Sequence, residues 1–237
     1  MKKITSITLL LFFTFSLFSQ KIRVETAEDL PTHYYNLENS TAMDYIQNET
    51  LVIQLANEVE KDLKADLEKY DILDKATLRK YESRLETIAL IKKDYEAALN
   101  HLKKTRELAE KEVDKYMIGL YDEVYILTKK DKSILNEEEF KKSLGKRLSE
   151  SLAKMPYEVI KEDVESQVGM LEILNENLYQ GVVEGQIQPI IDKSNNQVAQ
   201  STVISILSIN LTYKMLLPYA SEVYFPVYKK LYDANYK

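Results

Sequence analysis

Apolar residues recur every three or four positions along most of this chain after residue 50. The first run places Leu51, Leu55, Val59, Leu63 and Leu67 at four-residue intervals, with Glu, Asp and Lys between them. This spacing gives an α-helix a single apolar stripe. Only five Gly and five Pro are present among 237 residues, so turns are few and long helices are favoured. No stretch alternates as a half-buried strand does, and the sequence therefore predicts an all-α fold.

Further segments follow the same pattern. They begin near residues 74, 94, 113, 136, 157 and 202. The segment 157–193 is interpreted as one helix, roughly 50 Å long at 1.5 Å per residue, which Pro189 kinks or ends. Ser194, Asn195 and Asn196 form the next turn, and Pro226 interrupts the last segment, 219–237. We therefore expect antiparallel helical hairpins with one long helix in the C-terminal half.

The first residues are typical of a signal peptide. Lys2 and Lys3 precede an apolar stretch from Ile4 to Phe18, and Ser19 is a small residue at a plausible cleavage site. A secreted or periplasmic bacterial protein is therefore predicted. Removal of the two leader lysines changes the formal net charge from −6 to −8, and such an acidic chain does not favour nucleic acid as a partner.

Four parts are expected along the chain. They are a signal peptide (1–19), an extended arm (20–48), a repeat-like helical region (49–155), and a long-helix hairpin with a Tyr-rich end (156–237). The apolar stretch 198–217 contains Gln200, Asn210 and Lys214, which favours a buried core helix over a membrane span.

Few residues are suited to catalysis. The chain has no Cys and only two His, so no cofactor, metal site or catalytic group is predicted. His101 is interpreted as a surface or interhelical residue, and the many carboxylates as solvated helix faces. The chain as given is therefore not expected to be an enzyme, although an independent enzyme that uses Glu and Tyr alone stays a third possibility.

Seventeen tyrosines stand out. The candidate interaction surface comprises Tyr34, Tyr35, Tyr219, Tyr224, Tyr228, Tyr232 and Tyr236. The last five have nearly helical spacing and form either an adhesive face for a partner protein or a packing face against the preceding helix. The sequence does not favour one over the other.

The segment YESRLETIALIKKDYEAALNHLKKTRELAE, residues 81–110, resembles a tetratricopeptide helical hairpin. In such a hairpin, Ala89 and Ala98 would let two helices approach closely, with Tyr95 beside them. Lys93 stands where that family usually has Gly, and Glu110 where it often has Pro. Only one repeat is clear, which predicts a repeat-like hairpin within a helical domain rather than a solenoid.

Three longer stretches resemble the helical region that precedes the catalytic domain of large secreted subtilisin-like serine peptidases. They are DLPTHYYNLENSTAMDYI, the block from LEKYDILDK to KYMIGLY, and PYEVIKEDVESQVGMLEILNENLYQGVVEGQIQPIIDKS. That family's catalytic segments, which are DSG-like, HGTHVAG-like and GTSMA-like, do not occur in residues 1–237. The resemblance implies a non-catalytic accessory or pro-region that acts by protein contact with a cognate or downstream protease domain.

The alternative is a free-standing secreted module whose repeat-like groove holds a peptide or a surface partner. The reading frame downstream of Lys237 would distinguish the two hypotheses.

Overall fold

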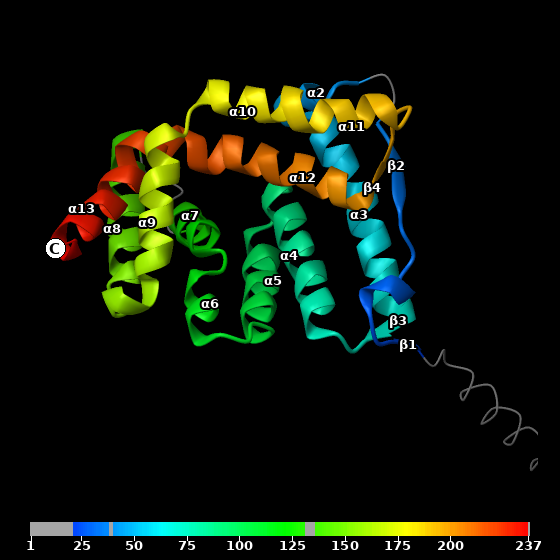
Figure 1. Ribbon diagram of the computed structural model, residues 1–237, viewed down its shortest axis with the longest axis horizontal. Helices are drawn as coiled ribbons and strands as arrows, with labels where there is room; N and C mark the ends of the chain where they lie inside the picture. The colour runs from blue at the N-terminus through cyan, green and yellow to red at the C-terminus, as the bar shows by residue number, and fades with distance from the viewer. Residues whose placement is uncertain (1–20, 38–39, 131–135, 237) are drawn as a thin grey trace, which may run out of the picture.

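The chain is mostly helical in a computed structural model that describes residues 21–37, 40–130 and 136–236 (Figure 1). The predicted signal peptide lies outside the described residues. The α-helices are α2 (Ala42–Gln47), α3 (Glu49–Lys69), α4 (Lys75–Ile91), α5 (Tyr95–Glu107), α6 (Glu112–Met117), α7 (Leu120–Lys130), α8 (Glu137–Leu152), α9 (Tyr157–Ile173), α10 (Glu176–Val182), α11 (Gln188–Lys193), α12 (Gln200–Leu211) and α13 (Phe225–Asn235). The predicted all-α class is confirmed at this level.

Side chains cap several helices where the sequence predicts their starts. Asp74 accepts hydrogen bonds from the backbone N–H groups of Ala76 and Thr77 at the start of α4. Asn136 and Glu139 form the expected capping box at the start of α8. Each cap satisfies backbone N–H groups that have no partner within the helix.

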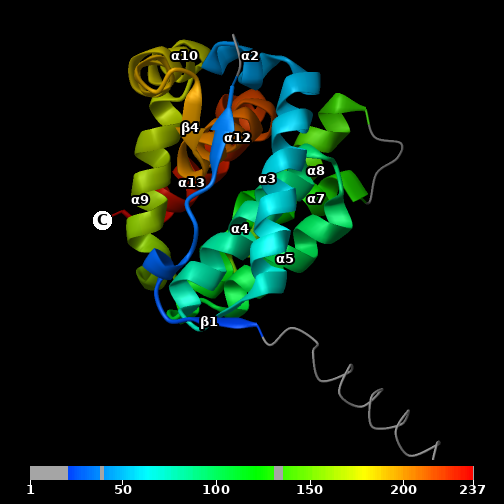
Figure 2. The same ribbon diagram turned by 90° about the vertical axis from the view of Figure 1, so that its right-hand side faces the viewer.

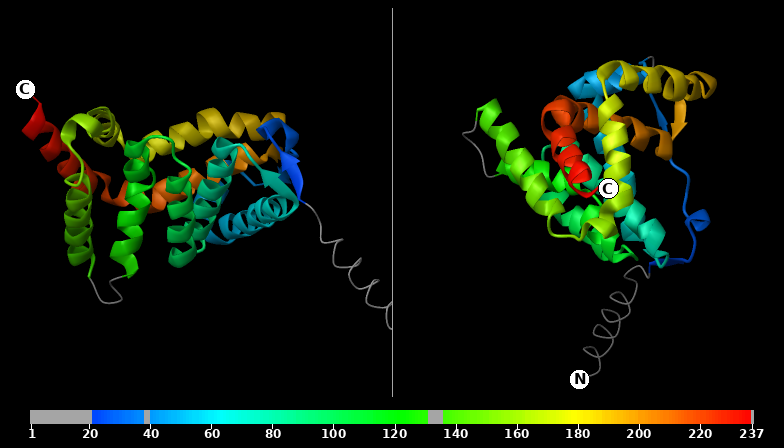
Figure 3. Two further views of the ribbon diagram at one scale, coloured as in Figure 1. Left: turned by 90° about the horizontal axis from the view of Figure 1, so that it is seen from below. Right: turned by 60° about the vertical axis from the view of Figure 1, so that its left-hand side comes forward.

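Helices α3 to α9 form a row, and two helical rods run along that row over one end of its helices (Figures 1 and 3). The lower rod is the continuous helical run from Gln200 to Asn235, which contains α12 and α13. The upper rod contains α10 and α11. The lower rod contacts α3, α4, α7, α8 and α9, so one rod touches most of the row.

Four short strands within the described part of the chain correct the expectation of a chain without strands. β1 (Ile22–Val24) pairs in parallel with β3 (Tyr70–Ile72), and β2 (Tyr34–Asn36) pairs antiparallel with β4 (Gln197–Ala199). The arm predicted at 20–48 is therefore held at two places and also contains α2 (Figure 2). Each strand has three residues, too few for alternation to be recognised.

The prediction of a single helix over 157–193 is wrong. Leu174 has an extended backbone, with φ of −68° and ψ of 118°, and it ends α9. Asn175 then caps α10, because its side chain accepts a hydrogen bond from the N–H of Leu178 at 3.0 Å. The chain turns sharply at this point, from α9 in the row to α10 in the upper rod (Figure 1).

Pro189, Pro218 and Pro226 lie within the two rods without ending them. Each proline follows a π-helical segment, respectively η2 (Val183–Ile187), η3 (Thr212–Leu216) and η5 (Ala220–Tyr224). In each case the residue just before the proline donates its N–H to the carbonyl five residues back. Because proline lacks an N–H, this wider turn lets the helix continue past it.

Two hydrophobic cores are joined by the lower rod. The first core contains residues of the arm, α2, α3, α4, η2, α11 and the first half of the rod, including Val203, Ile206 and Leu207. The second contains residues of α7, α8, α9 and the second half, including Tyr224 and Tyr228. By length and composition, Gln200–Asn235 is also the one described helix that could cross a membrane; in this structure its apolar side chains pack in both cores.

Candidate binding groove

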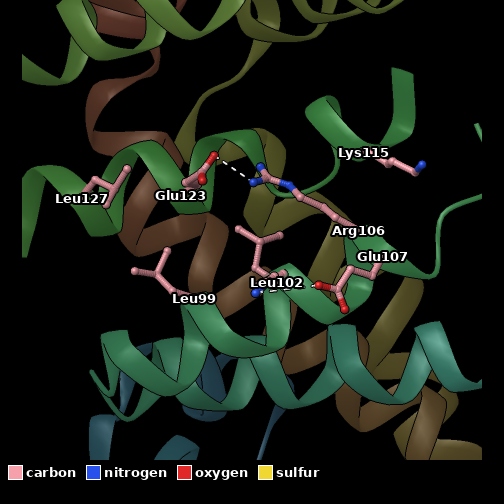
Figure 4. A pocket seen from close by; sticks show the side chains of 8 residues that line it. Leu99, Leu102, Arg106, Glu107, Lys115, Glu123 and Leu127 are labelled. Carbon is pink, nitrogen blue, oxygen red and sulfur yellow. Dashed lines mark ion pairs between the residues drawn. The ribbon is translucent and has the colours of Figure 1, made fainter. Parts of the chain in front are cut away.

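A cavity of about 590 Å³ lies between α5, α6 and α7 (Figure 4). Its apolar lining consists of Leu99, Leu102 and Leu127. Its charged lining consists of Lys103, Arg106, Glu107, Lys115 and Glu123. A floor of leucines with charges around it suits a partner that has both apolar and polar groups.

Helix α5 presents one side to this groove and the other to α4. Its start is fixed by Asp94, which accepts a hydrogen bond from the N–H of Ala97 at 3.1 Å. Residues 99, 102, 103, 106 and 107 recur at three- and four-residue spacing, so they share a face. Towards α4, Ala98 is buried in a small cluster with Ala89.

The far wall exists because the helix expected to begin near residue 113 is broken. α6 ends at Met117, and α7 begins at Leu120. Gly119 between them has φ of +62°, in the left-handed region that side chains disfavour. A β-carbon at Gly119 would lie 2.4 Å from Cδ1 of Leu102. Glycine therefore fits this turn without backbone strain and without displacing the Leu102 side chain.

Arg106 connects the two walls. Its Nε donates to the backbone oxygen of Ile118 at 2.9 Å, and its Nη1 forms an ion pair with Glu123 at 2.9 Å (Figure 4). The Arg106 side chain is 18% exposed, so both contacts are largely protected from water. Arg106 therefore fixes the α6–α7 turn against α5.

Two carboxyl groups lie behind Arg106. Burial raises the pKa of Glu86 to about 9, and the nearby Asp122 contributes to this shift. Burial also raises the pKa of Asp122. Glu86 therefore keeps its proton at neutral pH and can share it with Asp122. Glu86 is only 4% exposed, so its carboxyl group is shielded from solvent.

His101 lies between α4 and α5, as the interhelical interpretation expects. Its Nδ1 lies 2.6 Å from Oε2 of Glu82, and Lys104 lies 3.4 Å from the other carboxylate oxygen. Glu82 is 6% exposed. Burial acts to raise its pKa, but the partners His101 and Lys104 outweigh burial and hold that pKa below its usual value. The contact binds the two helices of the hairpin together.

The sequence gives no sign of a polar network that fastens the arm. The two ring nitrogens of His33 face Asp62 and Asp66 at 3.6 and 3.0 Å. The hydroxyl of Tyr35 donates to Asp62, and that of Tyr81 donates to Asp66, both at 2.7 Å. These groups come from the arm, α3 and α4, which the sequence does not place together.

Of the predicted arm tyrosines, only Tyr34 is open to solvent. It is 59% exposed, whereas Tyr35 is 5% exposed and belongs to the first core. Tyr35 points inward because β2 pairs with β4 and alternate residues of a strand face opposite sides. Tyr35 is therefore a packing residue in this structure, not part of a free surface.

The C-terminal tyrosines divide in a similar way. Tyr219, Tyr224 and Tyr228 are buried, and the ring of Tyr121 packs edge-on against Tyr224 with centroids 4.9 Å apart. This corrects their assignment to an interaction surface, because their area is already used in the second core. The ring of Tyr232 stacks on the ring of Tyr236 with centroids 4.7 Å apart, and Tyr236 is 64% exposed. Tyr35 packs in the first core, whereas Tyr219, Tyr224 and Tyr228 pack in the second, so these four buried tyrosines do not form one surface.

Sequence patterns alone did not reveal the groove. The single informative residue is Gly119, one of five glycines in the chain, because a glycine within a helical pattern signals a break. Among residues 21–37, 40–130 and 136–236, no group of three or more His, Asp or Glu side chains could hold a metal ion. Comparisons with known protein families, curated proteins and solved structures find no match to this chain.

Proposed function

We propose that this chain acts by protein contact, as an exported, non-catalytic helical accessory region of a subtilisin-like serine peptidase. One structural observation supports the proposal. The three stretches that carry the resemblance supply Tyr45, Leu85 and Ile191, among other residues, to the same first core. Stretches separated by more than 100 residues therefore depend on one another for folding, as expected of a single accessory unit.

A refolding experiment tests this proposal. Residues 20–237 are added to a denatured subtilisin-like catalytic domain, and recovery of peptidase activity is followed over time. Native protein is expected to increase the yield or to bind the refolded domain. The control is the variant Leu171→Asp, which places a charge at a side chain only 3% exposed in the second core and should abolish the effect by unfolding the chain. Equal recovery with and without native protein would count against the proposal.

The groove between α5, α6 and α7 favours a second candidate, a free-standing tetratricopeptide-like module that holds a peptide. In helical repeat proteins the partner lies along a surface shared by neighbouring helices. The rod of α12 and α13 covers parts of α4 and α7, but Leu99 and Leu127 of the groove stay partly exposed. An amphipathic peptide segment would fit such a surface.

Charge reversal at the groove tests the second candidate. Lys103 and Lys115 lie on opposite walls and are 76% and 39% exposed. The double variant Lys103→Glu and Lys115→Glu should weaken capture of groove-binding peptides without changing the melting temperature. Lys146→Glu on α8, where the side chain is 75% exposed, is the matched control. Undiminished capture by the double variant would exclude this groove as the peptide site.

A further inference from the structure

A second cavity, of about 490 Å³, lies on another side of α5. Helix α4 lines it with Arg79, Lys80, Ser83 and Arg84, and the other lining residues are Thr105, Asp114, Ile118 and Ile204. Three cations and one carboxylate give this lining an excess of two positive charges. The whole sequence has a formal charge of −6, so the charge of the cavity is opposite to that of the chain.

The guanidinium group of Arg84 has hydrogen-bond donors that are not used. Its Nη1 donates to Oε1 of Gln200 at 2.6 Å, and no carboxylate among the described residues forms an ion pair with it. Burial lowers the pKa of Arg84, yet a guanidinium stays charged at neutral pH. A half-buried cation without a carboxylate is unfavourable by itself, and an added anion would compensate it.

Arg79 is free to bind the same anion. No hydrogen bond or ion pair connects its side chain with another described residue. The side chain is half-buried. Arg79 and Ser83 are four residues apart on α4, which puts them on one face of the helix. Two guanidinium groups and a hydroxyl therefore line a single cavity, and guanidinium groups match the planar geometry of a carboxylate.

The cavity is also lined by an acidic residue and by two isoleucines. Asp114 comes from α6, and within the described chain no side-chain hydrogen bond or ion pair involves its carboxylate. Ile118 and Ile204 add apolar surface from the α6–α7 turn and from α12. A ligand that fills the cavity would thus meet cations from α4, an acceptor from α6, and two isoleucines.

We propose that this cavity binds a compact carboxylate that also carries an N–H donor, the chemistry shared by a free amino acid and the C-terminal residues of a peptide. Arg79 and Arg84 donate to the carboxylate, Asp114 accepts from the ligand's N–H, and the isoleucines contact its apolar side chain. A volume of about 490 Å³ is within the range of small-molecule sites. This site does not depend on which larger protein the chain contacts.

Isothermal titration calorimetry at low ionic strength tests the site with four probes. They are leucine, the tripeptide Gly-Gly-Leu, the same tripeptide with an amidated C-terminus, and inorganic phosphate. Gly-Gly-Leu is expected to bind with a dissociation constant on the order of 0.1–1 mM. Its amide should bind at least about tenfold more weakly, because it lacks the charge. Binding of leucine as tight as that of the tripeptide would identify a free amino acid as the ligand.

Variants locate the binding. Arg79→Gln should weaken Gly-Gly-Leu binding at least about tenfold without affecting folding, since Arg79 has no partner to lose. Arg84→Gln should weaken it similarly, and Asp114→Asn should also weaken it, because the N–H of the ligand then loses a charged acceptor. Lys146→Gln on α8, which removes the same charge at a side chain that is 75% exposed and lines neither cavity, should leave binding unchanged. No binding by wild-type protein at 10 mM probe, binding of phosphate alone, or equal affinity in Arg79→Gln would each overturn the proposal.

Discussion

Gly119 packs so closely on Leu102 that a β-carbon at Gly119 would lie 2.4 Å from the leucine Cδ1. The same β-carbon would lie 3.2 Å from Oε1 of Glu86, and the backbone φ of Gly119 is +62°. We expect Gly119→Ala to destabilise the protein by about 1–3 kcal/mol through overpacking, with backbone strain added. Urea denaturation followed by circular dichroism measures this change.

Gly169 and Gly181 are matched controls for that substitution. Both lie within helices, and a β-carbon at either meets nothing within 4 Å. Gly169→Ala and Gly181→Ala should each stabilise the protein by about 0.5–1 kcal/mol, because alanine favours helix over the unfolded chain. A Gly119→Ala variant as stable as these two would contradict the packing described for the α6–α7 turn.

Lys93 carries backbone strain in the turn between α4 and α5. Its φ is +60°, a conformation that costs a non-glycine residue about 1–2 kcal/mol. Lys93→Gly should therefore be more stable than Lys93→Ala by about 1 kcal/mol, as thermal melting of the two variants would measure. Both variants lose the exposed ion pair with Glu49. The difference between their stabilities therefore reports the backbone strain alone. Equal melting temperatures would argue against a left-handed Lys93.

Glu86 should make stability fall as pH rises. Its pKa is about 9 in the folded protein, whereas the usual value for a glutamate is about 4.5. Between these values the folded state holds a proton that the unfolded state has released. Each unit rise in pH therefore lowers the free energy of unfolding by about 1.4 kcal/mol at most. Glu86→Gln cannot ionise. The stability of this variant relative to wild type should therefore increase from pH 5 to pH 8, as parallel denaturation curves would show.

Glu82 provides the opposite case for comparison. Its pKa is held below the usual value despite burial, so its carboxylate contributes stability above about pH 4.5 that is lost as pH falls through the lower folded value. Glu82→Gln should therefore be less stable than wild type at neutral pH. If both Gln variants changed stability in the same direction at pH 8, the environments assigned to these two carboxyls would be wrong.

Asp66 should control how firmly the arm is attached. Its carboxylate accepts from Tyr81 at 2.7 Å and lies 3.0 Å from Nε2 of His33. Asp66→Asn should cost about 1–3 kcal/mol, because buried partners lose a charged acceptor. It should also speed hydrogen exchange of the amides in β2 and β4. Asp71→Asn, at an exposed position of β3, is the control, and unchanged exchange in Asp66→Asn would disprove this role.

Helix positions and their inward faces could be predicted from the sequence because local periodicity determines both. The stripe of α3, the hairpin of α4 and α5, and the capping box of α8 all follow from residues within one or two turns of each other. The breaks at Gly119 and Leu174 interrupt patterns that continue on both sides, so periodicity alone does not reveal them. Gly119 itself, a glycine within a helical pattern, was the local signal for the first break. Asn175, a good N-cap residue, was the local signal for the second break.

The second cavity could not be predicted from sequence because its contacts are distant in the chain. Arg84 meets Gln200, and the second cavity combines α4, α6 and α12. Burial of Tyr224 and Tyr228 depends on Tyr121 in α7. Periodicity predicts that these tyrosines share a face, but it does not show whether that face meets water or another helix.

The lower rod, which joins the two cores, has a consequence for the order in which the chain folds during synthesis. The first core joins residues near the start of the chain to Val203, Ile206 and Leu207. A ribosome must therefore have made most of the polypeptide before this core can close. Until then the early helices expose their apolar stripes, and a folding helper that binds such stripes would have a long time window in which to act.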